Sequence, residues 1–312
     1  MINNRKYQGS CINNFKIIDD QEITIPETLC KYYRLTEYSV DSILKSYFYT
    51  NHPAEFNDPF DCLRELSIQG KDAYDNYQII FMYFGIVCLS DNSDSMLMWA
   101  HYSGHNGFMI NFKTKRIENL FHSIYPINYV SKLPFINREN MGVAIMTSAN
   151  IKSSLWSYEK EWRCFHIPKI PMHFPSSNHS LVEFGDKLFK RENIQPKERK
   201  LKYDINAINY VSIGYKLIIE EDYFSDIATD SLEFNLKSEN KRMLIDFLID
   251  NNIPTRMTDF GDVDNFEIIN RPVQISRSKK GNFEYKLKAT LPNTSKAKVT
   301  PQRFALRRTV GG

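Results

Sequence analysis

The sequence predicts an α+β protein with a mixed, mainly antiparallel sheet and short helices. Short aromatic or apolar runs typical of strands alternate with short amphipathic runs typical of helices, and loops rich in Pro, Asn and Gly separate them. The spacing lacks the regular strand–helix–strand rhythm of a parallel α/β fold. With 312 residues, 42% of them hydrophobic, the chain is long enough for one large domain or two smaller ones.

Each expected element follows from a local pattern. Strands are expected at Leu29–Leu35, Tyr47–Thr50, Phe81–Ser90, Phe108–Phe112, Ile124–Val130, Lys160–Ile167 and Tyr210–Tyr215. Helices are expected at Ser39–Lys45, Met96–Tyr102, Asn140–Ser148 and Lys241–Asp250. Polar residues at Asp91–Ser95 supply a cap before the second helix, and Gly104 and Gly107 bracket a turn after it. Two prolines and Asn57-Asp58-Pro59 indicate a structured loop, for which Asx hydrogen bonds are the simplest explanation.

Composition and charge predict an irregular arm over residues 1–25, an α+β core domain over 26–274 and a basic tail over 275–312. The arm is polar and rich in Asn, and the tail has ten Lys or Arg against one acid, Glu284. The tail therefore carries a charge of +9, which leaves −6 for the rest of a chain whose net charge is +3. Such a tail suits nucleic acid or an acidic partner, unless it is only a solvated terminal strand and a loose end.

The same sequence predicts a cytoplasmic protein that does not enter a membrane. No apolar stretch reaches the roughly 20 residues of a membrane-spanning helix, and the N-terminus lacks the apolar segment of a secretion signal. The cysteines are five, scattered and never in a CxxC pair, which argues against a disulfide framework or a zinc knuckle. No GxxxxGK[ST], GxGxxG or GxSxG motif occurs, so a P-loop, Rossmann or α/β-hydrolase site is not expected.

The most informative segment is Trp156–Arg163, in which Glu159 and Glu161 lie two residues apart between aromatic residues. In an extended strand both carboxylates would project from one face, where their repulsion raises the proton affinity of at least one. Such a pair suits chemistry that stabilises an oxocarbenium-like charge on a sugar. The alternative is a structural role, in which Arg163 pairs with Glu161, lowers the pKa of that carboxyl and leaves it inert.

Four clusters in order resemble a bacterial family of uncharacterised cytoplasmic proteins, often encoded near phage-defence and mobile genes. Their signature pieces are KYR, FNDPF, MWxHYxxHxGF and WxYExEWR. Here they correspond to Lys31–Arg34, Phe56–Phe60, Met98–Phe108 and Trp156–Arg163. The resemblance covers roughly residues 29–220 and leaves the tail outside it. Because that family has no settled biochemical function, the resemblance by itself implies none.

The order of the clusters is also similar to that of mono-ADP-ribosyltransferases, although the His of their first strand and their Ser-Thr-Ser strand are missing. This resemblance implies an ADP-ribosyltransferase-like fold and an NAD-using toxin or effector with an unknown protein or nucleic-acid acceptor. Its implied cofactor-binding residues are Lys31 or Arg34 for the NAD ribose or pyrophosphate, and Tyr102 or Trp99 for stacking on nicotinamide. The implied catalytic residues are Glu161, which stabilises the oxocarbenium-like state, and Glu159, which orients the acceptor.

Two other functions stay open from the residues. His101 and His105 lie at i and i+4, a metal-ligand spacing on a helix, and Asp58, Asp61 or Glu161 could complete the shell of a metal-dependent nuclease. Gly104 argues against this site because it is expected to end the helix near His105. A third possibility is a non-catalytic sensor or adaptor that binds nucleic acid or a phage component through the basic tail.

Overall fold

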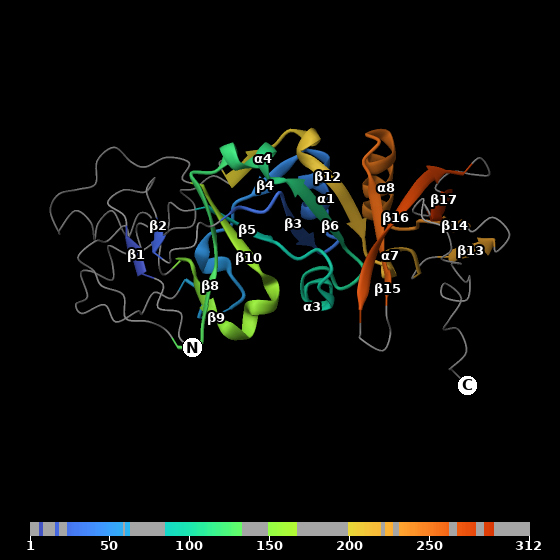
Figure 1. The fold of residues 1–312 in the computed structure, drawn as a ribbon. Helices are drawn as coiled ribbons and strands as arrows, with labels where there is room; N and C mark the ends of the chain where they lie inside the picture. The colour runs from blue at the N-terminus through green and yellow to red at the C-terminus, as the bar shows by residue number, and fades with distance from the viewer. Residues whose placement is uncertain are drawn as a thin grey trace. The chain divides into compact units, whose positions relative to one another are not determined.

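The computed structural model describes eleven stretches of the chain and divides by internal contacts into two compact units. The described stretches are 6–8, 16–18, 24–58, 60–62, 85–132, 149–166, 199–219, 222–226, 231–261, 267–278 and 284–289. Unit 1 comprises Met1–Leu29, Ser46–Asn92 and Lys113–Ala207, and unit 2 comprises Cys30–Lys45, Ser93–Phe112 and Ile208–Gly312. Figure 1 shows the elements of both units in chain order.

The described part of unit 1 consists of short strands and short helical turns. Its strands are β1 (Lys6–Gln8), β2 (Lys16–Ile18), β4 (Tyr47–Tyr49), β5 (Gly85–Ser90), β7 (Ser123–Pro126), β8 (Asn128–Val130), β9 (Ile151–Ser153), β10 (Glu161–His166) and β11 (Lys200–Lys202). Its helical turns are η1 (Pro53–Glu55), α4 (Thr114–Ile117), η3 (Glu118–Leu120), η4 (Ser154–Glu159) and η7 (Ile205–Ala207). β10 lies between β5 and β7, antiparallel to both, whereas β8 and β9 pair in parallel.

Unit 2 holds a larger sheet and the two longest helices. Its strands are β3 (Thr28–Tyr33), of which the part from Cys30 onward belongs here, β6 (Phe108–Lys113), β12 (Ile208–Ile213), β13 (Asp222–Asp226), β14 (Ser231–Asn235), β15 (Thr255–Phe260), β16 (Ile268–Arg277) and β17 (Glu284–Ala289). Its helices are α1 (Glu37–Leu44), α3 (Met96–Met98), the π-helical turn η2 (Trp99–Ser103), α7 (Lys216–Ile219) and α8 (Glu239–Asp250). The strand order is β13-β14-β17-β16-β15-β12-β6-β3.

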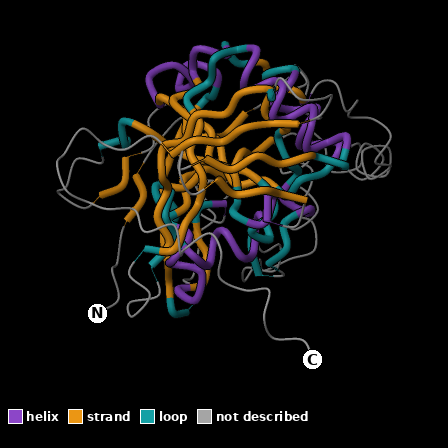
Figure 2. The backbone as a smooth tube through the Cα atoms, turned by 90° about the vertical axis from the view of Figure 1, so that its right-hand side faces the viewer, coloured by secondary structure: helices purple, strands orange, loops and turns teal. Residues whose placement is uncertain are grey.

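The sheet pairings confirm the predicted α+β class with a mixed, mainly antiparallel sheet. Strands β13 to β15 pair antiparallel through β14, β17 and β16, and β12 pairs antiparallel with β6. The pairing of β12 with β15 is parallel. Figure 2 shows how much of the described chain is strand compared with helix. No helix in the described stretches is both long enough and apolar enough to span a membrane.

Helices α1 and α8 each bury apolar side chains, and the N-terminus of α1 is also capped. Thr36 and Ser39 make a reciprocal capping box at the start of α1, which satisfies backbone donors that the first turn leaves open. Val40 and Ile43 of α1, and Leu244 of α8, are buried where the two helices pack together. In Figure 1, α8 lies alongside β15 and β16.

Most expected elements are found within a few residues of their predicted bounds, and one expected strand is wrong. The stretch Ile124–Val130 forms two strands, β7 and β8, because the chain leaves the sheet at Ile127. The Ile127 N–H donates to the Glu161 carbonyl, and Asn128 then begins a parallel pairing with β9. Pro126, which has no N–H, ends β7. The predicted helix at Asn140–Ser148 and residues 81–84 of the predicted strand lie outside the described residues.

Candidate functional site

The backbone around the paired glutamates differs from the single strand that the sequence predicts. Glu159 ends the 3₁₀ turn η4, Lys160 adopts a left-handed conformation with φ of 43°, and β10 begins only at Glu161. The Ser90 hydroxyl donates to the Glu159 carbonyl at 2.6 Å, which fixes this corner to β5. The expectation that strand periodicity alone puts both carboxylates on one face is therefore wrong.

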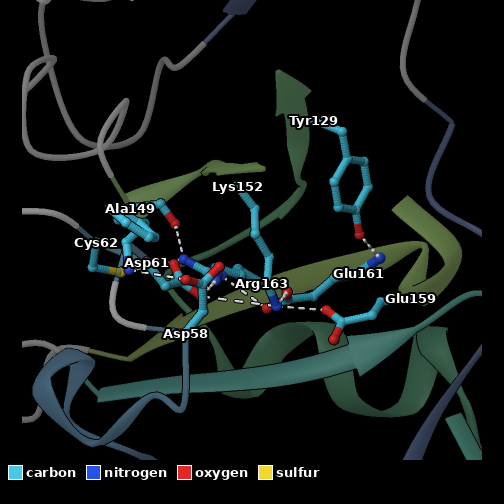
Figure 3. A network of polar contacts seen from close by, with 10 residues as sticks. Asp58, Asp61, Cys62, Tyr129, Ala149, Lys152, Glu159, Glu161 and Arg163 are labelled. Carbon is cyan, nitrogen blue, oxygen red and sulfur yellow. Dashed lines mark hydrogen bonds and ion pairs between the residues drawn. The ribbon is translucent and has the colours of Figure 1, made fainter. Parts of the chain in front are cut away.

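The two carboxylates nevertheless meet, because a buried lysine lies between them. Lys152 Nζ of β9 is 2.5 Å from Glu159 Oε2 and 3.1 Å from Glu161 Oε2 (Figure 3). All three side chains are at most 5% exposed. The half-buried Trp156 ring lies 5.0 Å from the same ammonium group. Sequence reasoning missed Lys152, whose only signal is a lysine next to an apolar residue in a short strand-like run.

Arg163 connects this pair to the Asp-rich loop. Its Nε donates to Glu161 Oε1 at 2.8 Å, and one Nη donates to Asp61 Oδ2 at 2.5 Å. The other Nη donates to the Ala149 carbonyl at 2.6 Å and to the Cys62 sulfur at 3.2 Å. The guanidinium is fully buried. This side chain therefore fixes β10 to the loop before Cys62, as Figure 3 shows.

The loop at Asp58 and Asp61 forms as an Asx turn, as the sequence indicates. Asp58 Oδ1 accepts from the Phe60 N–H at 2.9 Å, while Asp58 Oδ2 and Asp61 Oδ1 are buried without a hydrogen-bond partner among the described residues. The site as a whole holds four buried carboxylates (Asp58, Asp61, Glu159 and Glu161) and two buried cations (Lys152 and Arg163).

The electrostatics favour an ionised Glu161. Burial by itself raises the pKa of a carboxyl group, but Arg163 and Lys152 outweigh it and hold the pKa of Glu161 well below its ordinary value of 4.5. The Cys88 thiol also donates to this carboxylate. Burial lowers the pKa of Lys152, yet Glu161 and Glu159 reverse that effect, and the net shift is upward. The raised proton affinity expected from repulsion is therefore wrong for Glu161, since the paired cations decide its pKa.

The four predicted NAD-binding residues lie in unit 2, whereas Glu159 and Glu161 lie in unit 1. Lys31 on β3 is half-buried, with Nζ 5.6 Å from the Tyr33 ring centroid, and Arg34 is exposed and donates to the His101 carbonyl at 3.2 Å. Tyr102 is half-buried in η2. Their convergence with the glutamates in one site stays a prediction.

Trp99 belongs to the core of unit 2. Its side chain is fully buried, meets the Tyr32 ring edge-on at 5.3 Å between centroids, and donates its indole N–H to the Ser93 carbonyl at 3.3 Å. A ring packed in this way offers no open face for nicotinamide. Tyr102 is the better placed of the two predicted stacking residues.

The two histidines with metal-ligand spacing do not share a regular helix. The π-helical turn η2 ends at Ser103, and Gly104 and His105 are both left-handed, with φ of 62° and 58°. The expected helix end near His105 is confirmed. Within the described stretches, no three His, Cys, Asp or Glu side chains form a group that could hold a metal ion.

The segment that contains the paired glutamates matches a protein-family model. Residues 98–164 match a family model described as “Protein of unknown function (DUF2971)”. The matched stretch is about a fifth of the chain and spans Lys152, Glu159, Glu161 and Arg163, while Asp58 and Asp61 precede it. No curated protein and no solved structure matches the chain. The match supports the expected resemblance to an uncharacterised family.

Proposed function

We propose that the protein is an NAD-dependent ADP-ribosyltransferase that acts as a toxin or effector, with Glu161 as its catalytic carboxylate. The observation that carries this proposal is that both Glu161 oxygens contact buried cations, Arg163 Nε at 2.8 Å and Lys152 Nζ at 3.1 Å, which favours the charged carboxylate. The same contacts fit the structural alternative with an inert Glu161, and the variants below separate the two. A fixed anion in a region of low dielectric constant stabilises a developing positive charge far more than it does in water.

The proposed reaction breaks the bond between the ribose C1′ and the nicotinamide nitrogen, and the electron pair of that bond leaves with nicotinamide. Glu161 accepts a hydrogen bond from a ribose hydroxyl and stabilises the positive charge that develops on the sugar. A nucleophile on the acceptor, a protein or a nucleic acid, then bonds to C1′ and gives up its proton to water. We assign Glu159 to orienting the acceptor, because Lys152 holds both carboxylates on one ammonium group.

Release of nicotinamide from NAD by the full-length protein tests the proposal, with cell lysate supplied as a source of acceptors. The Glu161→Gln variant keeps the shape of the side chain and removes its charge, so release should fall at least a hundredfold. Glu118→Gln removes an exposed carboxylate of the same unit and is the matched control, which should leave release unchanged.

Thermal unfolding of Glu161→Gln must accompany the assay, because the change leaves Arg163 and Lys152 with less compensating charge. Since Glu159→Gln keeps the catalytic carboxylate, that variant should still release nicotinamide while transfer to acceptors falls. Equal nicotinamide release by folded Glu161→Gln and by the wild-type protein would exclude the proposed role of Glu161.

A further inference from the structure

Unit 2 carries a row of three rings in contact, tilted 46° and 54° to one another, that no part of the proposed reaction uses. The His105 ring lies 5.4 Å from the Tyr215 ring, and the Tyr215 ring lies 5.2 Å from the Phe260 ring, measured between centroids. Phe260, at the end of β15, is 48% exposed. A large aromatic side chain held by another ring and open to solvent provides a flat apolar face at the surface.

Backbone hydrogen bonds fix the two turns that carry this row of rings. The Tyr215 N–H donates to Thr258 Oγ1 at 2.8 Å, and the Lys216 N–H donates to the His105 carbonyl at 3.1 Å. A Cβ at Gly214 would lie 2.2 Å from that same carbonyl oxygen, so only glycine allows the close approach of the two turns. Because both turns are fixed before any ligand arrives, little conformational entropy is lost on binding.

His105, the first ring of this row, also carries polar nitrogen atoms. Its Nδ1 is buried and has no hydrogen-bond partner in the part of the chain that the structure describes. Burial and then the charge of Lys216 lower the pKa of His105, which keeps the imidazole neutral at pH 7.

Two cations border the same turn. Lys216 lies close enough to His105 to lower its pKa, and Arg34 donates to the carbonyl of His101, one turn before His105. Tyr33, which precedes Arg34, lies against Gly107 of this turn, since a Cβ at Gly107 would be 2.0 Å from the Tyr33 carbonyl oxygen. Arg34 is exposed and uses one guanidinium nitrogen for the His101 contact. A guanidinium with further donors is suited to phosphate.

We propose that this surface, formed by Arg34, His105, Tyr215, Lys216 and Phe260, binds a nucleotide, with its planar base on Phe260 and its phosphate beside Arg34 and Lys216. Stacking on the exposed ring supplies affinity that depends little on which base is present. The inference shares Arg34 with the predicted NAD-binding residues, but it does not depend on the roles proposed for Glu159 and Glu161, because it uses no residue of unit 1.

Isothermal titration of the full-length protein with AMP, adenosine and ribose 5-phosphate tests the inference. AMP should bind more tightly than adenosine, which lacks the phosphate, and than ribose 5-phosphate, which lacks the ring. Phe260→Ala should weaken AMP binding at least tenfold, as expected when one base–aromatic stack is lost. Arg34→Ala and Lys216→Ala should weaken AMP binding and leave adenosine binding unchanged.

Three further variants keep the result interpretable. Phe260→Leu preserves an apolar side chain against Tyr215 but lacks the flat face, so it should bind AMP as weakly as Phe260→Ala, whereas Phe260→Trp should retain binding. Tyr38→Ala removes an aromatic side chain that is 77% exposed on α1 and should bind AMP like the wild-type protein. Absence of AMP binding by the wild-type protein, or equal binding by Phe260→Leu, overturns the inference. AMP binding without nicotinamide release would leave this surface in place and remove the proposed reaction alone.

Discussion

At the scale of single residues, the pKa of Glu161 depends on two cationic side chains. One comes from another strand, nine positions before it, and one lies two positions along its own strand. Lys152 reaches Glu161 from β9, and Arg163 reaches it along β10. Their charges reverse the effect that burial and the neighbouring Glu159 would have on its pKa. The same contacts make this group of side chains sensitive to the loss of any one member.

Removing Arg163 should therefore be much more costly than removing an arginine at the surface. Arg163→Met leaves Glu161 and Asp61 buried without their main cation, and we expect a loss of about 3–5 kcal/mol in the free energy of unfolding. Arg277→Ala breaks solvent-exposed ion pairs to Asp246 and Asp250, and should lower the free energy of unfolding far less. Urea denaturation of both variants measures the difference, and equal losses would contradict the buried network.

The stability of the protein should also fall at acid pH through Glu161. Because the folded pKa of Glu161 is below its ordinary value of 4.5, its contribution is complete above that pH and is lost as the pH falls further. Urea midpoints measured from neutral pH down to about 3 should therefore drop less steeply for Glu161→Gln than for the wild-type protein. The exposed Glu118→Gln should follow the wild-type profile, and a Glu161→Gln profile as steep as that one would argue against the low pKa.

At the scale of elements, the turn between η2 and β6 is fixed by close backbone contacts. Gly104 ends the π-helical turn with φ of 62° and has open space around it, whereas Gly107 lies against the Tyr33 and Ser103 carbonyls. The two glycines are therefore needed for different reasons, one for its backbone conformation and one for the lack of a side chain.

The two alanine variants should separate these reasons. Gly104→Ala pays only the left-handed strain of about 1–2 kcal/mol. Gly107→Ala places a methyl group 2.0 Å from a backbone oxygen, so the end of β3 or the turn must shift, and we expect the larger loss of stability. Thermal unfolding compares them, and the opposite order would show that the turn adapts easily.

At the scale of the whole molecule, part of the basic tail is a structural strand. β17 lies between β14 and β16, and its Tyr285 and Leu287 are each 2% exposed. Tyr285 stacks on Phe234 of β14 at 5.6 Å between ring centroids. The strand therefore contributes to the core of unit 2, while residues 290–312 lie outside the described residues.

Two truncations should consequently behave differently. Ending the chain at Ile275 removes β17 and exposes Leu232 and Phe234, so the protein should lose several kcal/mol of stability through lost apolar burial. Ending it at Ala289 keeps every described strand and should leave the urea midpoint close to that of the full chain. Nucleic-acid binding through the tail is then tested on the second truncation, whose fold is intact. A stable protein ending at Ile275 would contradict the position of β17.

The pattern of residues predicts the fold class, the helices α1 and α8, and the strands β3, β4, β5, β6, β10 and β12. Strands β1, β2, β9, β11 and β13 to β17 lie outside the predicted strands. Apolar and aromatic runs such as Phe108–Phe112 become strands because their side chains must be buried, and the Thr36–Ser39 capping box starts α1 through contacts within four residues. The Asx turn at Asp58 and the helix end at Gly104 follow equally from local chemistry. Such features depend on neighbours along the chain, so the pattern of residues suffices to predict them.

The charges that meet Glu161 follow from tertiary contacts. The Lys152 ammonium lies between Glu159 and Glu161 because β9, η4 and β10 come together around it, and Asp61 reaches Arg163 across 102 positions of sequence. The row of rings formed by His105, Tyr215 and Phe260 likewise brings together side chains from three separate segments. A pKa depends on every charge within a few ångströms and on burial, and neither quantity is encoded in the spacing of residues along one segment.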